Sequence, residues 1–286
     1  MLLFAWGLFK KVVVADQLAF YADRIYNNVH DYSGLTLIIG TYAYALQVYF
    51  DFAGYTDMAR GAGRIFGIEL TENFNRPYGA TSIADFWRRW HISFSRWILD
   101  YIFKPLQMTW RHRGQAGTAA AVLVTFLVSG IWHGGAWGFV IWGLLHGTYL
   151  AASVYYRPYQ KRLHKWLGVE KSRWLKWWQI FVTFNLVSFA WIFFRANSLG
   201  DAFYVISNIN YGYKGLRSGI LLSQGLVSLI ITVCVVWLSY FMKNIFVNYG
   251  KKPHLVIRWL AYHFVFLLVL FFYVTTKSPD FLYFRF

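Results

Sequence analysis

Long, mostly apolar runs limit how this chain can fold more than any other feature of its sequence. A helix needs about 20 apolar residues to cross a bilayer core, and inside it every backbone N–H and C=O group must be paired within the chain. We therefore predict an all-α, polytopic membrane protein with about six to seven transmembrane helices plus interfacial or re-entrant helices. The candidate spans are residues 2–20, 35–53, 117–133, 136–156, 177–194, 219–242 and 256–275.

Composition supports a membrane protein. Of the 286 residues, 58% are hydrophobic and 14% are charged, whereas a soluble domain has about 25% charged residues. The net charge of +16 falls in segments between apolar runs, so it indicates a membrane face next to anionic lipid and not a nucleic-acid partner. The single cysteine, Cys234, lies in an apolar run and permits neither an intrachain disulfide nor a cysteine-cluster metal site.

The basic loops predict an orientation. Residues Arg157–Lys176 hold seven Lys or Arg residues and one Glu, and short loops rich in Lys and Arg face the cytoplasm. Alternation of the spans then places the turn at His133 towards the outer side. It also places the C-terminal Phe286 outside a bacterial cytoplasmic (inner) membrane.

The segment DFWRRWHISFSRW, Asp85–Trp97, combines Trp, Phe, Arg and one His. As one continuous helix it would group His91 with Trp and Phe rings, while Arg89 and Arg96 would lie opposite and seat the helix at the membrane interface. This pattern explains the rings and the arginines. It leaves open whether His91 is a satisfied structural residue or a reactive one.

The segment SGIWHGGAWGFVIWGLLHG contains a second histidine, His133, in a glycine-rich turn between two apolar spans. Gly134/Gly138 and Gly143/Gly147 are small residues four apart, which allow close helix packing. Packing does not explain an ionisable side chain at membrane depth, where such groups usually serve a function. His146 lies within a span and could instead form a hydrogen bond between helices.

Other catalytic signatures are absent from the sequence. It contains no GxSxG, no HExxH and no phosphate-binding glycine loop, and no cluster of metal ligands is visible. We therefore expect no bound metal or cofactor, and a histidine acting as general base in a membrane cavity. Asp51 is expected to place its carboxylate near a membrane edge. Asp57 is predicted to form a structural ion pair, because Arg60 and Arg64 follow it by three and seven residues, close to one helix face.

One long block of the sequence resembles a known family. The run YFDFAGYTDMARGAGRIFGIELTENFNRPYGATSIADFWRRWHISFSRWILDYIFKPL, the segment around His133, and AWIFFRANSLGDAF are similar to the membrane-bound O-acyltransferases (MBOAT proteins). They look most like the bacterial branch of alginate O-acetylation and D-alanyl transfer proteins. Family chains are longer and begin with further membrane helices, so residues 1–286 look like a single MBOAT-like domain truncated at its N-terminus.

The resemblance implies functional residues. His133 matches the family's invariant, presumed catalytic histidine, and His91 matches a second conserved polar position in an RWHxS context. Asp51, Asn73, Asn75, Arg76 and Pro77 match the pattern as scaffold.

The resemblance also implies an activity and partners. The expected reaction moves an acyl group, chiefly acetyl, from a cytoplasmic thioester such as acetyl-CoA to a hydroxyl of an exported or cell-surface polysaccharide, or of a periplasmic or extracellular relay protein. One alternative is D-alanyl transfer from a carrier protein to teichoic acid. The other is an inactive fragment or a non-catalytic membrane scaffold.

Overall fold

The structure is a computed structural model that describes residues 2–210, 212 and 255–275. The described residues form helices and contain no strand, which confirms the predicted all-α class. The chain divides into two compact units, Met1–Glu72 with Gly200–Phe286, and Asn73–Leu199. The predicted span 219–242, with Cys234, and the C-terminal Phe286 lie outside the described residues.

Three helices in the described part of the chain are long and apolar enough to cross a membrane. They correspond to the predicted spans 117–133, 136–156 and 177–194. The total of six to seven spans stays a prediction, as does the single domain. The bounds of the three are Arg111–His133, Trp137–Trp166 and Arg173–Arg195.

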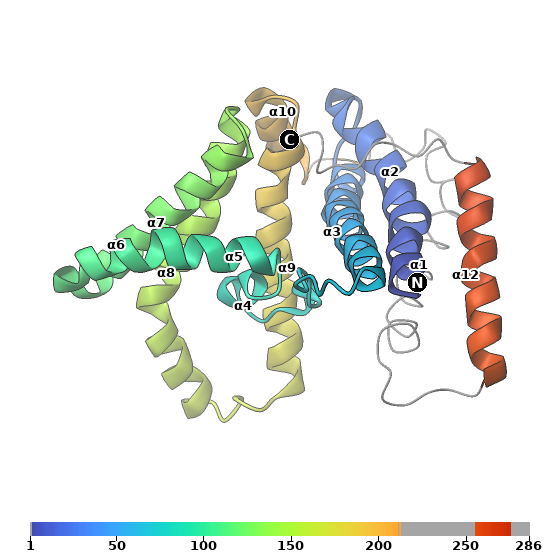
Figure 1. Ribbon diagram of the computed structural model, residues 1–286. Coiled ribbons are helices and arrows are strands. Elements are labelled where there is room, and N and C mark those ends of the chain that lie inside the picture. Colours follow the sequence, from blue (N-terminus) through green and yellow to red (C-terminus); the bar gives the residue numbers. More distant parts are fainter. Residues whose placement is uncertain (1, 211, 213–254, 276–286) are drawn as a thin grey trace. The chain divides into compact units, whose positions relative to one another are not determined.

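The first unit packs its N-terminal helices on one long helix, α3 (Leu35–Ile65). The glycines let the backbones touch, because a Cβ atom on Gly7 would lie 2.5 Å from the carbonyl oxygen of Gly54. Figure 1 shows α1 and α2 alongside α3. The remaining elements of the unit are α1 (Leu2–Phe9), the π-helical η1 (Lys10–Ala15), α2 (Asp16–Tyr26), η2 (Val29–Asp31), α10 (Leu199–Asn208) and α12 (Leu255–Thr275).

A buried ion cluster joins η1 to α2 and α3. The ammonium group of Lys11 lies 2.8 Å from Asp16 Oδ1 and 2.7 Å from Asp51 Oδ1. All three residues are less than 5% exposed. The charges that interrupt the predicted span 2–20 are therefore satisfied within the protein.

A second ion cluster lies beside the first. Lys10 Nζ is 2.5 Å from Asp57 Oδ2, and Arg60 is 3.3 Å from the other oxygen of the same carboxylate. The predicted structural pairing of Asp57 with Arg60 is confirmed. The π-helical turn places the consecutive residues Lys10 and Lys11 against two different carboxylate groups of α3.

We predict that Lys11→Met lowers the free energy of unfolding by about 3–5 kcal/mol, because it removes the ammonium group that contacts two buried carboxylates. The matched control is Lys104→Met, which removes an ion pair with Asp100 that is at least half exposed at both partners. That change should cost less than about 1 kcal/mol. Denaturant unfolding in one detergent measures both. Equal losses in the two variants would contradict a structural role of the buried cluster.

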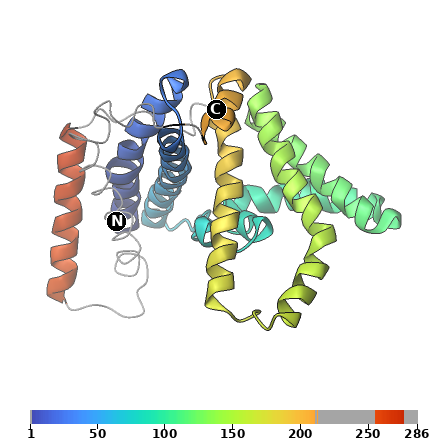
Figure 2. The same cartoon turned by 180° about the vertical axis from the view of Figure 1, so that it is seen from behind.

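The second unit is built on three long helices, α7 (Gly114–His133), α8 (Trp137–Trp166) and α9 (Arg173–Arg195). Figures 1 and 2 show α8 and α9 joined at one end by a short connection. The shorter elements precede α7 in the sequence: η3 (Pro77–Gly79), α4 (Ile83–Trp87), α5 (Ile92–Ile98), η4 (Leu99–Phe103), α6 (Lys104–Thr109) and η5 (Arg111–Arg113).

Glycines bring α7 and α8 into backbone contact. A Cβ atom on Gly130 would lie 2.4 Å from the carbonyl oxygen of Phe139, and one on Gly143 would lie 2.3 Å from that of Phe126. The expected role of Gly143 in close packing is thus confirmed. Gly130 is an additional member of the same contact.

The helix α8 is longer than its apolar run. It continues ten residues past the predicted end of span 136–156 and includes Pro158. The basic residues Arg157–Trp166 therefore belong to a helix, and the expected long loop shrinks to residues 167–172. Lys, Arg and Gln are good helix formers, so the helix continues beyond its apolar part.

Candidate active site

The segment that carries His91 folds as two short helices and not as one. The helix α4 covers Ile83–Trp87 and α5 covers Ile92–Ile98. His91 lies between them in the left-handed conformation, with φ 41° and ψ 58°. The prediction of one continuous helix over Asp85–Trp97 is therefore wrong. Such a conformation costs on the order of 1–3 kcal/mol outside glycine and persists only where the surroundings hold it.

Residues 73–75, called the strap below, stabilise the break between α4 and α5 by hydrogen bonds. The backbone N–H of Asn75 donates to the carbonyl of Arg89 (2.9 Å), and the N–H of Ile92 donates to the carbonyl of Asn73 (3.0 Å). The side-chain oxygen of Asn73 accepts from both the N–H (3.0 Å) and the hydroxyl (2.7 Å) of Ser93. The scaffold role expected for Asn73 and Asn75 is to fix the backbone on both sides of His91.

The imidazole of His91 is held in its neutral form. Burial lowers the pKa of His91 to about 4, because the charged imidazolium loses its hydration there. Its Nδ1 lies 3.5 Å from the hydroxyl of Ser93, at the outer limit of a hydrogen bond. At neutral pH His91 can therefore accept a proton or a hydrogen bond.

The helix break changes where the neighbouring side chains lie. Trp87, Trp90 and Ile98 are buried as the helical pattern predicted, but Trp97 is 52% exposed. Residues 88–91 are not helical, so the side chains after the break do not point in the directions that a continuous helix would give them. The expected grouping of all these rings on one face is therefore only partly realised.

The arginines of this segment differ from one another. Arg89 forms a two-pronged pair with Asp85, with both nitrogen–oxygen distances at 3.0 Å. Arg88 reaches the same carboxylate at 3.6 Å, and Arg96 is exposed. The expectation that Arg89 acts only as an interfacial charge is incomplete, because lysine cannot reproduce this fork geometry.

His133 is the last residue of α7, and Gly134 ends the helix with a φ of 156°. The predicted glycine turn at this position is thus confirmed. Aromatic rings surround the imidazole: the ring centroids of Trp132, Trp142 and Phe194 lie 4.9, 5.0 and 5.1 Å from its own. Trp142 stands perpendicular to it. This enclosure keeps the imidazole in an apolar surrounding.

Phe94 links the two histidines. Its ring centroid lies 5.2 Å from that of His91 and 6.2 Å from that of His133. It also stacks on Trp132 at 4.5 Å. The structure therefore brings together the two residues that the sequence singled out, although they lie 42 positions apart in the chain.

His146 has a structural contact that the sequence left open. Its Nδ1 accepts a hydrogen bond from the indole N–H of Trp87 (3.2 Å), and the side chain is fully buried. The bond ties α4 to α8, so the hydrogen bond between helices that was one explanation for His146 is present. The ring centroid of Trp142, which packs on His133, lies 5.1 Å from that of His146. His146 therefore contacts Trp87, in the segment that carries His91, and Trp142, a ring beside His133.

Buried polar atoms without a hydrogen-bond partner gather in these helices. They include the indole N–H of Trp142, which is 1% exposed, and the hydroxyl of Ser129, one helical turn before His133. Buried polar groups are nearly always paired, so an unpaired one asks for an explanation. The sequence did not draw attention to Trp142, which lies six residues past the start of the predicted span 136–156.

Comparison with known proteins agrees with this arrangement. The sequence model of the MBOAT, membrane-bound O-acyltransferase family, matches residues 1–193, which include the strap, His91 and His133. The chain belongs to the MBOAT family.

Relatives of this MBOAT chain come from several bacteria. It is 40% identical over 72% of its length to a peptidoglycan O-acetyltransferase of Helicobacter pylori. It is also 40% identical over 70% of its length to a probable alginate O-acetylase AlgI of Azotobacter vinelandii. With a teichoic acid D-alanyltransferase of Bacillus subtilis it shares 35% identity over 54% of its length. The matched parts cover 38%, 37% and 39% of these relatives, so the chain spans little more than a third of their length.

We predict that His91 titrates with a midpoint near pH 4, well below the ordinary 6.5. The imidazole of the folded protein should stay mostly neutral as the pH falls from 7 to 5. The stability that this neutral form contributes is complete above about pH 6.5 and should be lost progressively as the pH falls from there to about 4. Imidazole ¹⁵N shifts of histidine-labelled protein in micelles measure this, with His91→Gln to assign the signal. A midpoint at 6 or above would contradict the buried, neutral His91.

Proposed function

We propose that this MBOAT chain carries the reaction centre of an acyl transfer in which His133 is the general base. The observation that supports the proposal is the enclosure of His133 by aromatic rings, with the braced His91 on the other side of Phe94. An apolar enclosure strengthens the electrostatic interactions on which proton transfer depends.

In the proposed reaction His133 takes the proton of an acceptor hydroxyl. At the same time the oxygen of that hydroxyl attacks the carbonyl carbon of an acyl thioester. The new C–O bond forms as the C–S bond breaks, and the proton then passes to the departing thiolate. His91, neutral at pH 7, orients the donor or shares this proton transfer. No metal or cofactor takes part in these steps.

The developing negative charge on the carbonyl oxygen needs a hydrogen-bond donor. The arginines are poorly suited, because Arg89 is paired with Asp85 and Arg96 is exposed. The indole N–H of Trp142 is buried without a hydrogen-bond partner, and the centroid of the Trp142 ring lies 5.0 Å from that of His133. We assign this N–H as the donor to the oxyanion.

The comparisons support acetyl as the acyl group. The two O-acetyl-transferring relatives match more of the chain at higher identity than the D-alanyltransferase does. The proposed donor is acetyl-CoA or another acyl thioester, reached from the cytoplasm. The proposed acceptor is a hydroxyl of an exported or cell-surface polysaccharide, or of a relay protein outside a bacterial cytoplasmic membrane.

D-alanyl transfer from a carrier protein to teichoic acid is the second candidate, and the D-alanyltransferase relative favours it. Radiolabelled acetyl-CoA and a D-alanyl-loaded carrier, offered separately to membranes containing the chain, distinguish the two. Incorporation from neither donor, with the protein folded, would favour a non-catalytic scaffold.

We predict that His133→Ala lowers product formation at least a hundredfold while expression and membrane insertion stay near normal, because a general base contributes about 10²–10⁴ in rate. His112→Ala is the control, since His112 is exposed and lies outside the histidine pair. Product per amount of folded protein is the measurement. More than a tenth of the wild-type rate in His133→Ala would remove His133 from the mechanism.

We predict that Trp142→Phe lowers kcat about a hundredfold with little change in KM, because an oxyanion donor acts only in the transition state. Trp132→Phe is the control: this ring also lies beside His133, at 4.9 Å, but it is 52% exposed. Steady-state kinetics and thermal midpoints are compared for both. Equal kcat values in the two variants would exclude the indole N–H of Trp142 as the donor.

A further inference from the structure

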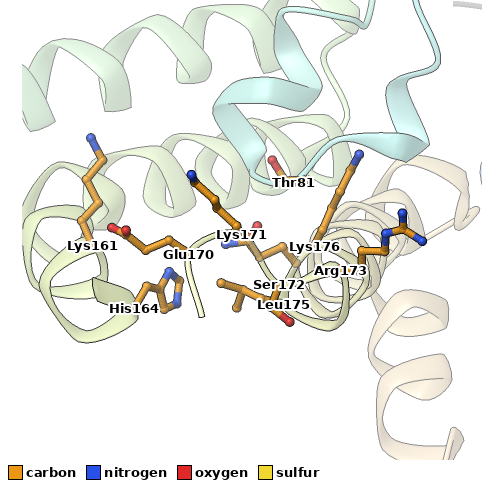
Figure 3. A pocket seen from close by; sticks show the side chains of 10 residues that line it. Thr81, Lys161, His164, Glu170, Lys171, Ser172, Arg173, Leu175 and Lys176 are labelled. Atoms are coloured by element: carbon orange, nitrogen blue, oxygen red, sulfur yellow. The ribbon is translucent and has the colours of Figure 1, made fainter. Parts of the chain in front are cut away.

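The second unit contains an open cleft of about 500 Å³ at the connection between α8 and α9. Figure 3 shows it from close by. Thr81, from the segment before α4, reaches into the same cleft. The side chains that line it are Thr81, Lys161, His164, Glu170, Lys171, Ser172, Arg173, Leu175, Lys176 and Gln179.

The cleft carries an excess of positive charge. Four of its side chains are Lys or Arg and one is Glu, so its net charge is 4 − 1 = +3 with His164 neutral. In the part of the chain that the structure describes, none of these five groups forms an ion pair. In contrast, Asp85 and Asp100 elsewhere in this unit each hold a basic partner. The cations of the cleft are therefore available to a ligand.

The polar side chains of the cleft suit an anionic group, and in Figure 3 Lys161 and Lys176 lie on opposite sides of it. In Figure 3 the ammonium ends of Lys161, Lys171 and Lys176 point to the side on which Thr81 lies. The hydroxyls of Thr81 and Ser172 also line the cleft and can donate hydrogen bonds to an oxygen ligand. Several cations with added hydroxyl donors are the groups that bind phosphate oxygens in proteins.

The cleft is separate from the histidine pair. On α8, Lys161 follows Trp142, which packs on His133, by 19 residues, and this corresponds to about 28 Å at 1.5 Å per residue. The side chains that line the cleft include none of the aromatic rings around His133. The cleft is a second site.

Exposed tryptophans near the cleft in the sequence indicate whether its anionic ligand is a lipid or a soluble molecule. Trp166 and Trp174 are 81% and 85% exposed, and Trp177 and Trp178 are more than 60% exposed. Trp rings prefer the headgroup level of a bilayer, and basic residues at that level attract anionic lipids. Large apolar rings beside a basic cleft fit a lipid surface better than they fit a soluble anion.

We propose that this cleft binds the phosphate group of an anionic membrane lipid. Lys161, Lys171 and Lys176 contact the phosphate, and the neighbouring Trp rings lie among the upper parts of the lipid chains. The site does not depend on the acyl-transfer activity, so its test measures binding alone.

The test is lipid binding by the full chain, measured by native mass spectrometry after titration with phosphatidylglycerol or phosphatidylcholine. We expect the chain to bind phosphatidylglycerol in preference. The double variant Lys171→Gln/Lys176→Gln should weaken this binding at least tenfold, because it removes two charge-assisted contacts to the phosphate.

The matched control is Arg162→Gln/Lys165→Gln, which removes two exposed charges of the same α8 segment that do not line the cleft. This control should keep phosphatidylglycerol binding within threefold of the wild type. An equal loss in both double variants would overturn the proposal in favour of a diffuse surface charge. Adenosine 3′,5′-bisphosphate is the soluble competitor: if it displaces phosphatidylglycerol at equal concentration, the cleft takes a soluble phosphate and the lipid assignment is wrong. Unchanged thermal midpoints show that the variants fold.

Discussion

The cost of burying polar groups away from water governs both units of this protein. Lys11 is tolerated in a buried position because Asp16 and Asp51 contact it, and His146 is tolerated because Trp87 donates to it. Some buried polar atoms of the described residues have no hydrogen-bond partner, among them the hydroxyl of Ser129 and the indole N–H of Trp142, whose ring lies beside that of His133. In the proposed reaction the carbonyl oxygen of the acyl donor would accept a hydrogen bond from the Trp142 N–H.

The left-handed backbone conformation occurs at His91, a residue of the proposed reaction centre. The strap formed by Asn73 and Asn75 takes up the backbone groups that a continuous helix would have paired. The imidazole of His91 lies against Phe94, a residue of α5, which begins directly after the interruption. A strained backbone that is held by several hydrogen bonds is a common device for presenting a reactive side chain in a fixed orientation.

Much of this arrangement could be predicted from the sequence, but the parts that depend on distant contacts could not. Apolar runs located α7, α8 and α9, and an ionisable residue beside glycines marked His133. The helix break at His91 could not be predicted, because Asn73, which binds Ser93, lies 20 positions upstream and the local sequence pattern fits a continuous helix. The ion pair of Lys11 with Asp51 on α3 could not be predicted for the same reason, since the two residues lie 40 positions apart in the sequence. The family resemblance identified both histidines, whereas only the structure drew attention to Trp142.

The glycine contact between α7 and α8 has a mechanical consequence. With the backbone of Gly130 against that of Gly143, no flexible side chain separates the two helices, and neither can slide or rotate past the other without first moving apart. The pair therefore acts as one rigid lever that carries His133 and Trp142 at a constant spacing. Any motion that admits a substrate must therefore take place outside this helix pair.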